Sequence, residues 1–182
     1  MRRVDFSALI TEESAKREVL HEAINRTLAH RDRDGSSKQA WKRACEAFRS
    51  YVSPLDPFLK RACEEQRYVD KELLEFVVCF FEVDPWFFRS GYLKQMLLTR
   101  LKRSELGAQN KRRLRAVLLD AVDRRGTREF KYYCRLAAAI ADAGLVSALE
   151  DVSGREGDQR ASRAKLMLDT IRQREEWRAA SA

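Results

Sequence analysis

Positively charged side chains with the chemistry to bind phosphate gather around a predicted turn between two helices. The set consists of Arg100, Lys102, Arg103, Lys111, Arg112, Arg113 and Arg115. Its second half begins a predicted helix, where a cation opposes the helix dipole by roughly 0.3 to 1 kcal/mol. Free backbone N–H groups at a helix start also bind phosphate. We therefore predict an anion site here, with a solvated charged end that aids solubility as the alternative.

A second basic set lies further along the chain and includes an aromatic ring. Arg128, Lys131, Tyr132 and Arg135 have the spacing i, i+3, i+4 and i+7, which places them on one side of a helix. A tyrosine among cations can stack on a nucleobase while the cations contact phosphates. The pattern predicts nucleic-acid contact, and an ordinary amphipathic exterior is the alternative.

Consecutive aromatic residues precede these sets and offer a third candidate site. Trp86, Phe87 and Phe88 are followed closely by Tyr92. If the three begin a helix, their side chains diverge by about 100° each, so at least one points away from the core. That side chain would line a groove or a subunit contact, whereas core packing is the alternative.

Catalytic and metal-binding patterns are weak. Glu72 and Glu75, with Glu82, are the carboxylates nearest to a paired arrangement, but no Glu-x-x-His accompanies them. The four cysteines lack ligand spacing and suit small buried hydrophobes in a reducing compartment. We predict no cofactor and no metal site, and we favour a binding protein while leaving enzymatic activity open.

The positive charge of the chain is concentrated in one segment. The formal net charge is +8, yet residues 89–135 hold 14 Lys and Arg against 4 Asp and Glu, a net +10, and the rest of the chain is net −2. Such asymmetry indicates an anionic partner: nucleic acid, an acidic protein surface or a layer of lipid headgroups.

The surrounding elements are predicted to be helices. The 3 Pro and 7 Gly, with 35% charged residues, favour long helices with short breaks. The aromatic-rich stretch 73–98 is expected to form the core. Caps and apolar periodicity predict helices at about 12–30, 38–51, 57–66, 71–83, 85–103, 111–125, 128–143 and 159–178. The short apolar segment 145–152 follows Gly144, the expected end of the seventh helix, while Thr127 is expected to cap its start.

Two of these helices share a pattern that resembles HEAT repeats. Asp84 precedes Arg89 by five residues, and Asp123 precedes Arg128 by five, with the two units 39 residues apart. The resemblance covers about 73–149, and 65–70 offers no third copy. It implies an α-solenoid in which these Asp and Arg side chains form a structural ladder between repeats.

We therefore expect an all-α protein, either a HEAT-like superhelix or an irregular bundle of about eight helices. We assign 1–182 to a single domain, in which 155–182 forms a helix that docks on the core or projects as an arm. We predict a cytoplasmic binding module, without a membrane span or secretory signal, whose segment 89–135 docks nucleic acid. The alternative is a protein-interaction scaffold or homo-oligomer that uses exposed aromatic residues.

Overall fold

The computed structural model describes residues 4–124, 128–155 and 157–181. Within them the chain forms helices and no strands, which confirms the predicted all-α class. The helices are α1 (Phe6–Leu28), α2 (Gly35–Ser50), α3 (Asp56–Glu64), α4 (Lys71–Val83), α5 (Ser90–Leu101), α6 (Ala108–Asp123), α7 (Phe130–Ile140), α8 (Ala143–Ser153) and α9 (Gln159–Ala180).

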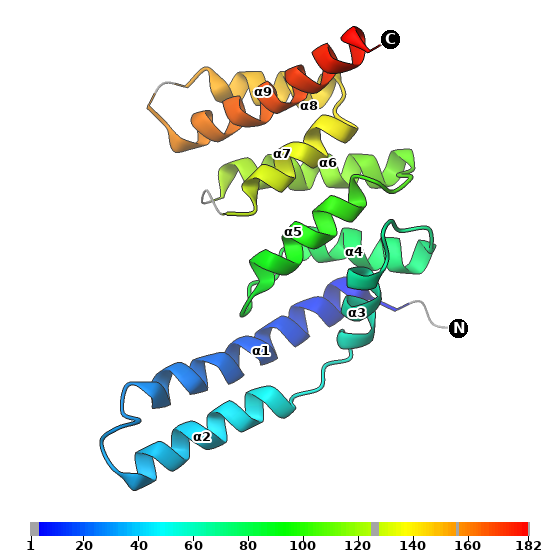
Figure 1. The fold of residues 1–182 in the computed structure, drawn as a ribbon. Coiled ribbons are helices and arrows are strands. Elements are labelled where there is room, and N and C mark those ends of the chain that lie inside the picture. Colours follow the sequence, from blue (N-terminus) through cyan, green and yellow to red (C-terminus); the bar gives the residue numbers. More distant parts are fainter. Residues whose placement is uncertain (1–3, 125–127, 156, 182) are drawn as a thin grey trace.

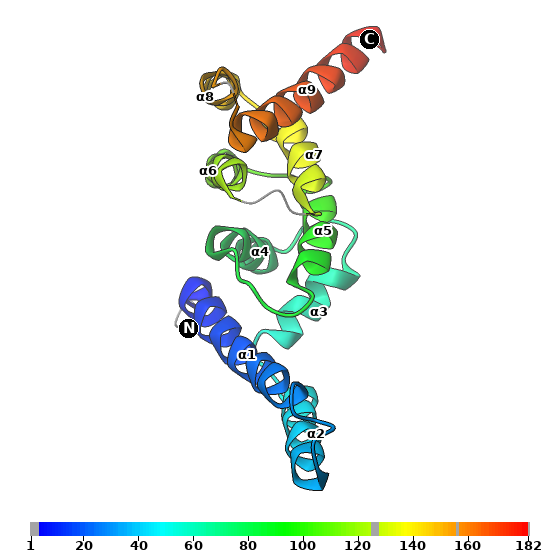
Figure 2. The same ribbon diagram turned by 90° about the vertical axis from the view of Figure 1, so that its left-hand side faces the viewer.

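These helices stack in two layers. In the first layer each helix contacts the next in the order α1, α4, α6 and α8. In the second layer the order is α3, α5, α7 and α9. Figure 2 shows α4, α6 and α8 on one side of the stack and α5, α7 and α9 on the other. The layering agrees with a superhelix, while the resemblance to HEAT repeats stays a prediction.

Helix α4 lies at the centre of the core, as predicted. Asp70 caps its first turn by accepting a hydrogen bond from the Leu73 amide at 2.8 Å. Phe76, Phe80 and Phe81 are fully buried, since α4 is apolar around most of its circumference and is enclosed by α1, α3 and α6. The buried residues form one cluster that extends from α1 to α9.

Helix α1 begins earlier than the predicted residue 12, because Asp5 supplies the cap by accepting a hydrogen bond from the Ala8 amide at 3.0 Å. Its far half packs on α2 and contacts Phe87 and Phe88, and the α1–α2 pair projects as a hairpin at the lower end of Figure 1. Val19 and Leu28, apolar side chains in this half, are therefore 59% and 46% exposed.

The aromatic segment before α5 is not helical, which corrects the prediction of a helix from Pro85. Asp84 ends α4 with a left-handed backbone (φ 49°), and Arg89 precedes α5 with another (φ 67°). An Asp-Pro pair is typical of a helix start, but here the proline follows a helix end. Trp86, Phe87 and Phe88 therefore lie on a connecting segment.

Two boundaries differ near the C-terminus. Helix α7 ends at Ile140, and Gly144 lies in the first turn of α8, which Asp142 caps. The segment 145–152 thus belongs to a helix that was not predicted. The predicted cap Thr127 lies outside the described residues. Helix α9 both docks and projects: Met167, Leu168 and Ile171 are buried, whereas Trp177 is 70% exposed.

Candidate functional site

The structure divides the predicted basic residues into those that hold the helices together and those that remain available. Arg100 belongs to the first group. Its Nε donates to the Glu65 carbonyl and its Nη2 to the Cys63 carbonyl, both at 2.6 Å. These carbonyls end α3 and have no partner within that helix. Arg100 therefore fastens α5 to α3.

Arg113 joins α6 to α4. Its guanidinium donates to Glu82 at 2.7 and 2.6 Å and to Glu75 at 2.7 Å, and it also contacts the Cys79 sulfur at 3.3 Å. The hydrogen bonds to Glu82 and Glu75 raise the pKa of Arg113. Two of the three carboxylates considered for catalysis, Glu75 and Glu82, are thus occupied by a structural cation.

Arg115 also has a structural role. Its Nε donates to the Ile140 carbonyl at 2.8 Å and its Nη1 pairs with Asp142 at 2.5 Å, where α7 ends and α8 begins. Lys111 and Arg112 lie in the first turns of the same helix, in the layer opposite α5 and α7, and Arg112 is exposed. The predicted anion site at this helix start is therefore divided between two layers.

A further group of cations comes from the turn that follows α5 and from α7 and α9. Burial and the neighbouring charges of Arg174, Arg135 and Arg103 lower the pKa of Lys102. Arg174 in turn has its pKa lowered by burial and by Arg178. We call this set the cation cluster: Lys102, Arg103, Arg135, Arg174 and Arg178. Across the described ranges, none of the five forms a salt bridge with a carboxylate.

Tyr132 continues this charged surface along α7. The Lys131 ammonium lies 5.3 Å and the Arg135 guanidinium 5.2 Å from the centre of its ring. These distances are typical of cation–π contacts. Arg128 is separate from them, because it precedes α7 and its guanidinium lies 5.5 Å from the Tyr92 ring. The predicted four-residue face is therefore split between α7 and a neighbouring groove.

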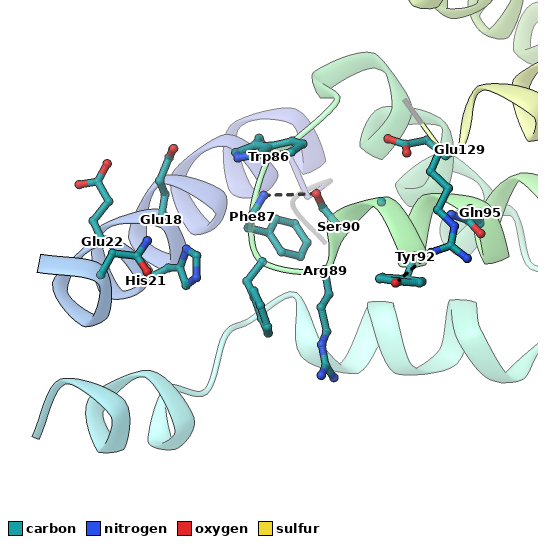
Figure 3. Close-up of a pocket in the computed structure, with 14 residues that line it drawn as sticks. Glu18, His21, Glu22, Trp86, Phe87, Arg89, Ser90, Tyr92, Gln95 and Glu129 are labelled. Atoms are coloured by element: carbon teal, nitrogen blue, oxygen red, sulfur yellow. Dashed lines mark hydrogen bonds between the residues drawn. The ribbon is translucent and has the colours of Figure 1, made fainter. Parts of the chain in front are cut away.

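That groove, which we call the aromatic groove, has a volume of about 670 Å³ and lies where α1, the segment 84–89 and the start of α5 meet (Figure 3). Trp86, Phe88 and Tyr92 line it and are 69%, 49% and 58% exposed. Phe88 also packs between the hairpin helices, with ring centroids 5.2 Å from His21 and 6.1 Å from Phe48. All four predicted aromatics thus line a cavity, although Phe87 is half-buried whereas the other three are exposed.

A smaller cavity of about 290 Å³ adjoins the groove and shares Trp86 and Glu129 with it. Lys94 lies at this cavity, 3% exposed, and its Nζ pairs with an Asp84 oxygen at 2.6 Å. Burial lowers the pKa of Lys94 to about 8, although the charge of Glu129 opposes the shift. The sequence analysis did not single out Lys94 or Glu129. The signal for Lys94 is a lone cation within the apolar stripe of residues 93–98.

The Asp residues of the repeat pattern do bind cations, but not the predicted ones. Asp84 also pairs with Arg124, and Asp123 pairs with Arg160, each cation coming from a later part of the stack. Arg89 lies against the Phe88 ring at 5.2 Å. The ladder partners therefore differ from those that the HEAT pattern implies.

The described helices include none that is both long and apolar enough to cross a membrane. No group of His, Cys, Asp or Glu among the described residues has the arrangement of a metal site. Comparison of the chain with family models, with curated proteins and with solved structures finds no match.

Proposed function

We propose that this chain is a nucleic-acid-binding module whose contact surface is the cation cluster together with the exterior of α7. The observation that carries the proposal is the gathering of five cations, from the turn after α5 and from α7 and α9 of the same layer, without a salt-bridge partner among the described residues. This set replaces most of the predicted one, because Arg100, Arg113 and Arg115 are occupied in the fold.

Mutual repulsion of like charges opposes the folded state, so local stability does not explain the cluster. A polyanion relieves this repulsion and releases its own counterions on binding. Adjacent packed helices lie about 8–10 Å apart, so three of them span roughly 16–20 Å. That length matches about five nucleotides at a rise of 3.4 Å each.

The experiment measures fluorescence anisotropy of labelled single-stranded and duplex oligonucleotides while salt is raised. We expect binding at low salt that weakens steadily as salt increases. The variant Lys102→Gln/Arg103→Gln/Arg135→Gln should bind at least tenfold more weakly. The control Lys42→Gln/Arg43→Gln/Arg49→Gln removes equal charge from exposed positions on α2 and should bind like the wild type. Absence of binding at low salt, or equal loss in both variants, would refute the proposal.

Self-association is a second candidate function, which the exposure of Trp86 and Phe88 favours. Light scattering across a concentration series tests it. A mass that rises with concentration and returns to that of a monomer in Trp86→Ala would support a homo-oligomer. A constant monomer mass would exclude it.

A further inference from the structure

The aromatic groove lies at one end of the proposed nucleic-acid surface. Helix α5 begins at the groove with Ser90 and ends next to Lys102. Its 12 residues span about 18 Å at 1.5 Å per residue. Glu129 at the groove likewise precedes α7, which carries Arg135. A strand bound along the two helices therefore reaches the groove without leaving the protein surface.

The groove wall contains a carboxylate without a hydrogen-bond partner, on a residue that is otherwise largely buried. Glu129 is 8% exposed, and its carboxylate forms no hydrogen bond or salt bridge with any residue that the structure describes. Figure 3 shows it pointing along the groove wall toward Trp86. The carboxylate oxygens are reached from the groove, so they can accept hydrogen bonds from a ligand that enters it.

Gly91 permits this placement of the carboxylate. A Cβ at position 91 would lie 3.3 Å from Glu129 Oε2, which is tighter than an ordinary contact. The group that lies closest to the position of a side chain at this glycine is therefore the Glu129 carboxylate. The Glu129 carboxylate thus packs against the first turn of α5 at the groove.

The aromatic segment is held in an unusual backbone conformation. Asp84 and Arg89, which flank it, are the non-glycine residues with positive φ in the described parts of the chain. Left-handed backbone is unfavourable for a residue such as arginine, and such strain concentrates at functional sites. The exposure of Trp86 is consequently a feature that the backbone imposes, rather than the result of a loose loop.

The charges at the groove favour a neutral ring over a phosphate in its interior. Glu18 and Glu22 stand on the α1 wall with Glu129 across from them, while Arg89 and Arg128 lie against the Phe88 and Tyr92 rings. Carboxylates repel phosphate but accept hydrogen bonds from the amino and imino groups of a base. The arginines are placed to meet the phosphates on either side of that base.

We infer that the aromatic groove binds one unpaired nucleobase of a nucleic-acid strand, stacked on Trp86 or Tyr92, with Glu129 accepting hydrogen bonds from its N–H donors. The inference rests on the proposed nucleic-acid function and adds base preference to it. Guanine suits the carboxylate best, since its N1–H and N2–H lie side by side. Thymine presents a single N3–H between two carbonyl oxygens that repel a carboxylate.

The test compares decamers of thymidine in which one central residue is guanosine, thymidine or an abasic sugar. Wild type should bind the guanosine decamer about tenfold more tightly than the thymidine decamer. Glu129→Gln should remove this preference without weakening the thymidine decamer. Glu46→Gln on α2 makes the same change in net charge at an exposed position and should keep the preference. Trp86→Ala/Tyr92→Ala, which lacks both stacking rings, should reduce the difference in affinity between the guanosine and abasic decamers.

A second variant keeps the test valid if Glu129→Gln folds poorly. Gly91→Ala displaces the carboxylate and should reduce the preference for guanosine, with circular dichroism confirming the helical fold. Equal wild-type affinity for all three decamers would overturn the inference while leaving nucleic-acid binding in place. Absence of binding to any of them would overturn both. Binding of labelled decalysine to wild type, lost in Glu129→Gln, would identify a cationic peptide as the ligand and would also overturn the inference.

Discussion

Glu13 ties α1 to the segment that follows α2, and its replacement by glutamine should destabilise the protein in a pH-dependent way. The side chain is 1% exposed. Its Oε2 accepts hydrogen bonds from Tyr51 at 2.6 Å and Ser53 at 2.7 Å, and its Oε1 accepts one from Lys16 at 2.9 Å. Burial alone would raise the pKa of Glu13, but hydrogen bonds from Tyr51, Lys16 and Ser53 outweigh it and lower the pKa to about 2.

The sign and size of the effect follow from this shift. A carboxylate whose pKa is lower in the folded state stabilises that state above the unfolded pKa of 4.5, and the contribution is lost as pH falls toward 2. A shift of about 2.5 units at 1.36 kcal/mol each gives roughly 3 kcal/mol at pH 7. At pH 3 the same relation leaves about 1 kcal/mol.

Urea unfolding followed by circular dichroism at pH 7 and pH 3 measures the contribution. The difference in unfolding free energy between wild type and Glu13→Gln should fall by about 2 kcal/mol between these pH values. Glu12→Gln is the matched control, because Glu12 has 65% of its side chain exposed and pairs only at the surface. We expect it to remain within about 0.5 kcal/mol of wild type. Equal losses for Glu13→Gln at both pH values would refute the reasoning.

Three further predictions concern other parts of the stack. Arg113→Gln should lower the unfolding free energy by about 1–2 kcal/mol, because it removes the ion pairs to Glu75 and Glu82. Its oligonucleotide affinity should stay unchanged, and weaker binding at equal helicity would contradict the structural role of Arg113. Phe80→Ala should cost about 3–5 kcal/mol in thermal or urea unfolding, whereas a loss below 1 kcal/mol would place the core elsewhere. Lys94 has a pKa of about 8 in the folded state and 10.5 in the unfolded state, so between these pH values the unfolded state holds more protons. The unfolding free energy therefore rises with pH across this range. Urea unfolding should show the rise in wild type and not in Lys94→Met.

The sequence predicts the helices well where a single signal determines them. Helix α4 has an aspartate cap and an almost continuous apolar surface, and α9 has a clear apolar stripe. The Asp84-Pro85 pair misleads, because the same two residues suit a helix start and the residue after a helix end. Only the packing of Phe87 on Phe80, with ring centroids 6.4 Å apart, shows how the segment returns to the core.

The candidate site was harder to predict, since a sequence gives the number of cations but not their partners. The acceptors of Arg100 and Arg113 lie 31 to 38 residues away in the chain, so only the fold reveals that these cations are occupied. Arg174 lies outside the basic segment and joins the cluster only because α9 packs on α7. Glu129 lies within the segment, but its burial depends on the close approach to Gly91.

The most direct test of the central claim is the salt dependence of single-strand binding in a variant that neutralises Lys102, Arg103, Arg135 and Arg174. For single strands, the slope of log affinity against log salt is about −0.7 for each phosphate neutralised. If each of the four cations contacts a phosphate, the slope should become shallower by about 3 relative to wild type. An unchanged slope would show that the cation cluster does not contact the nucleic acid and would contradict the account.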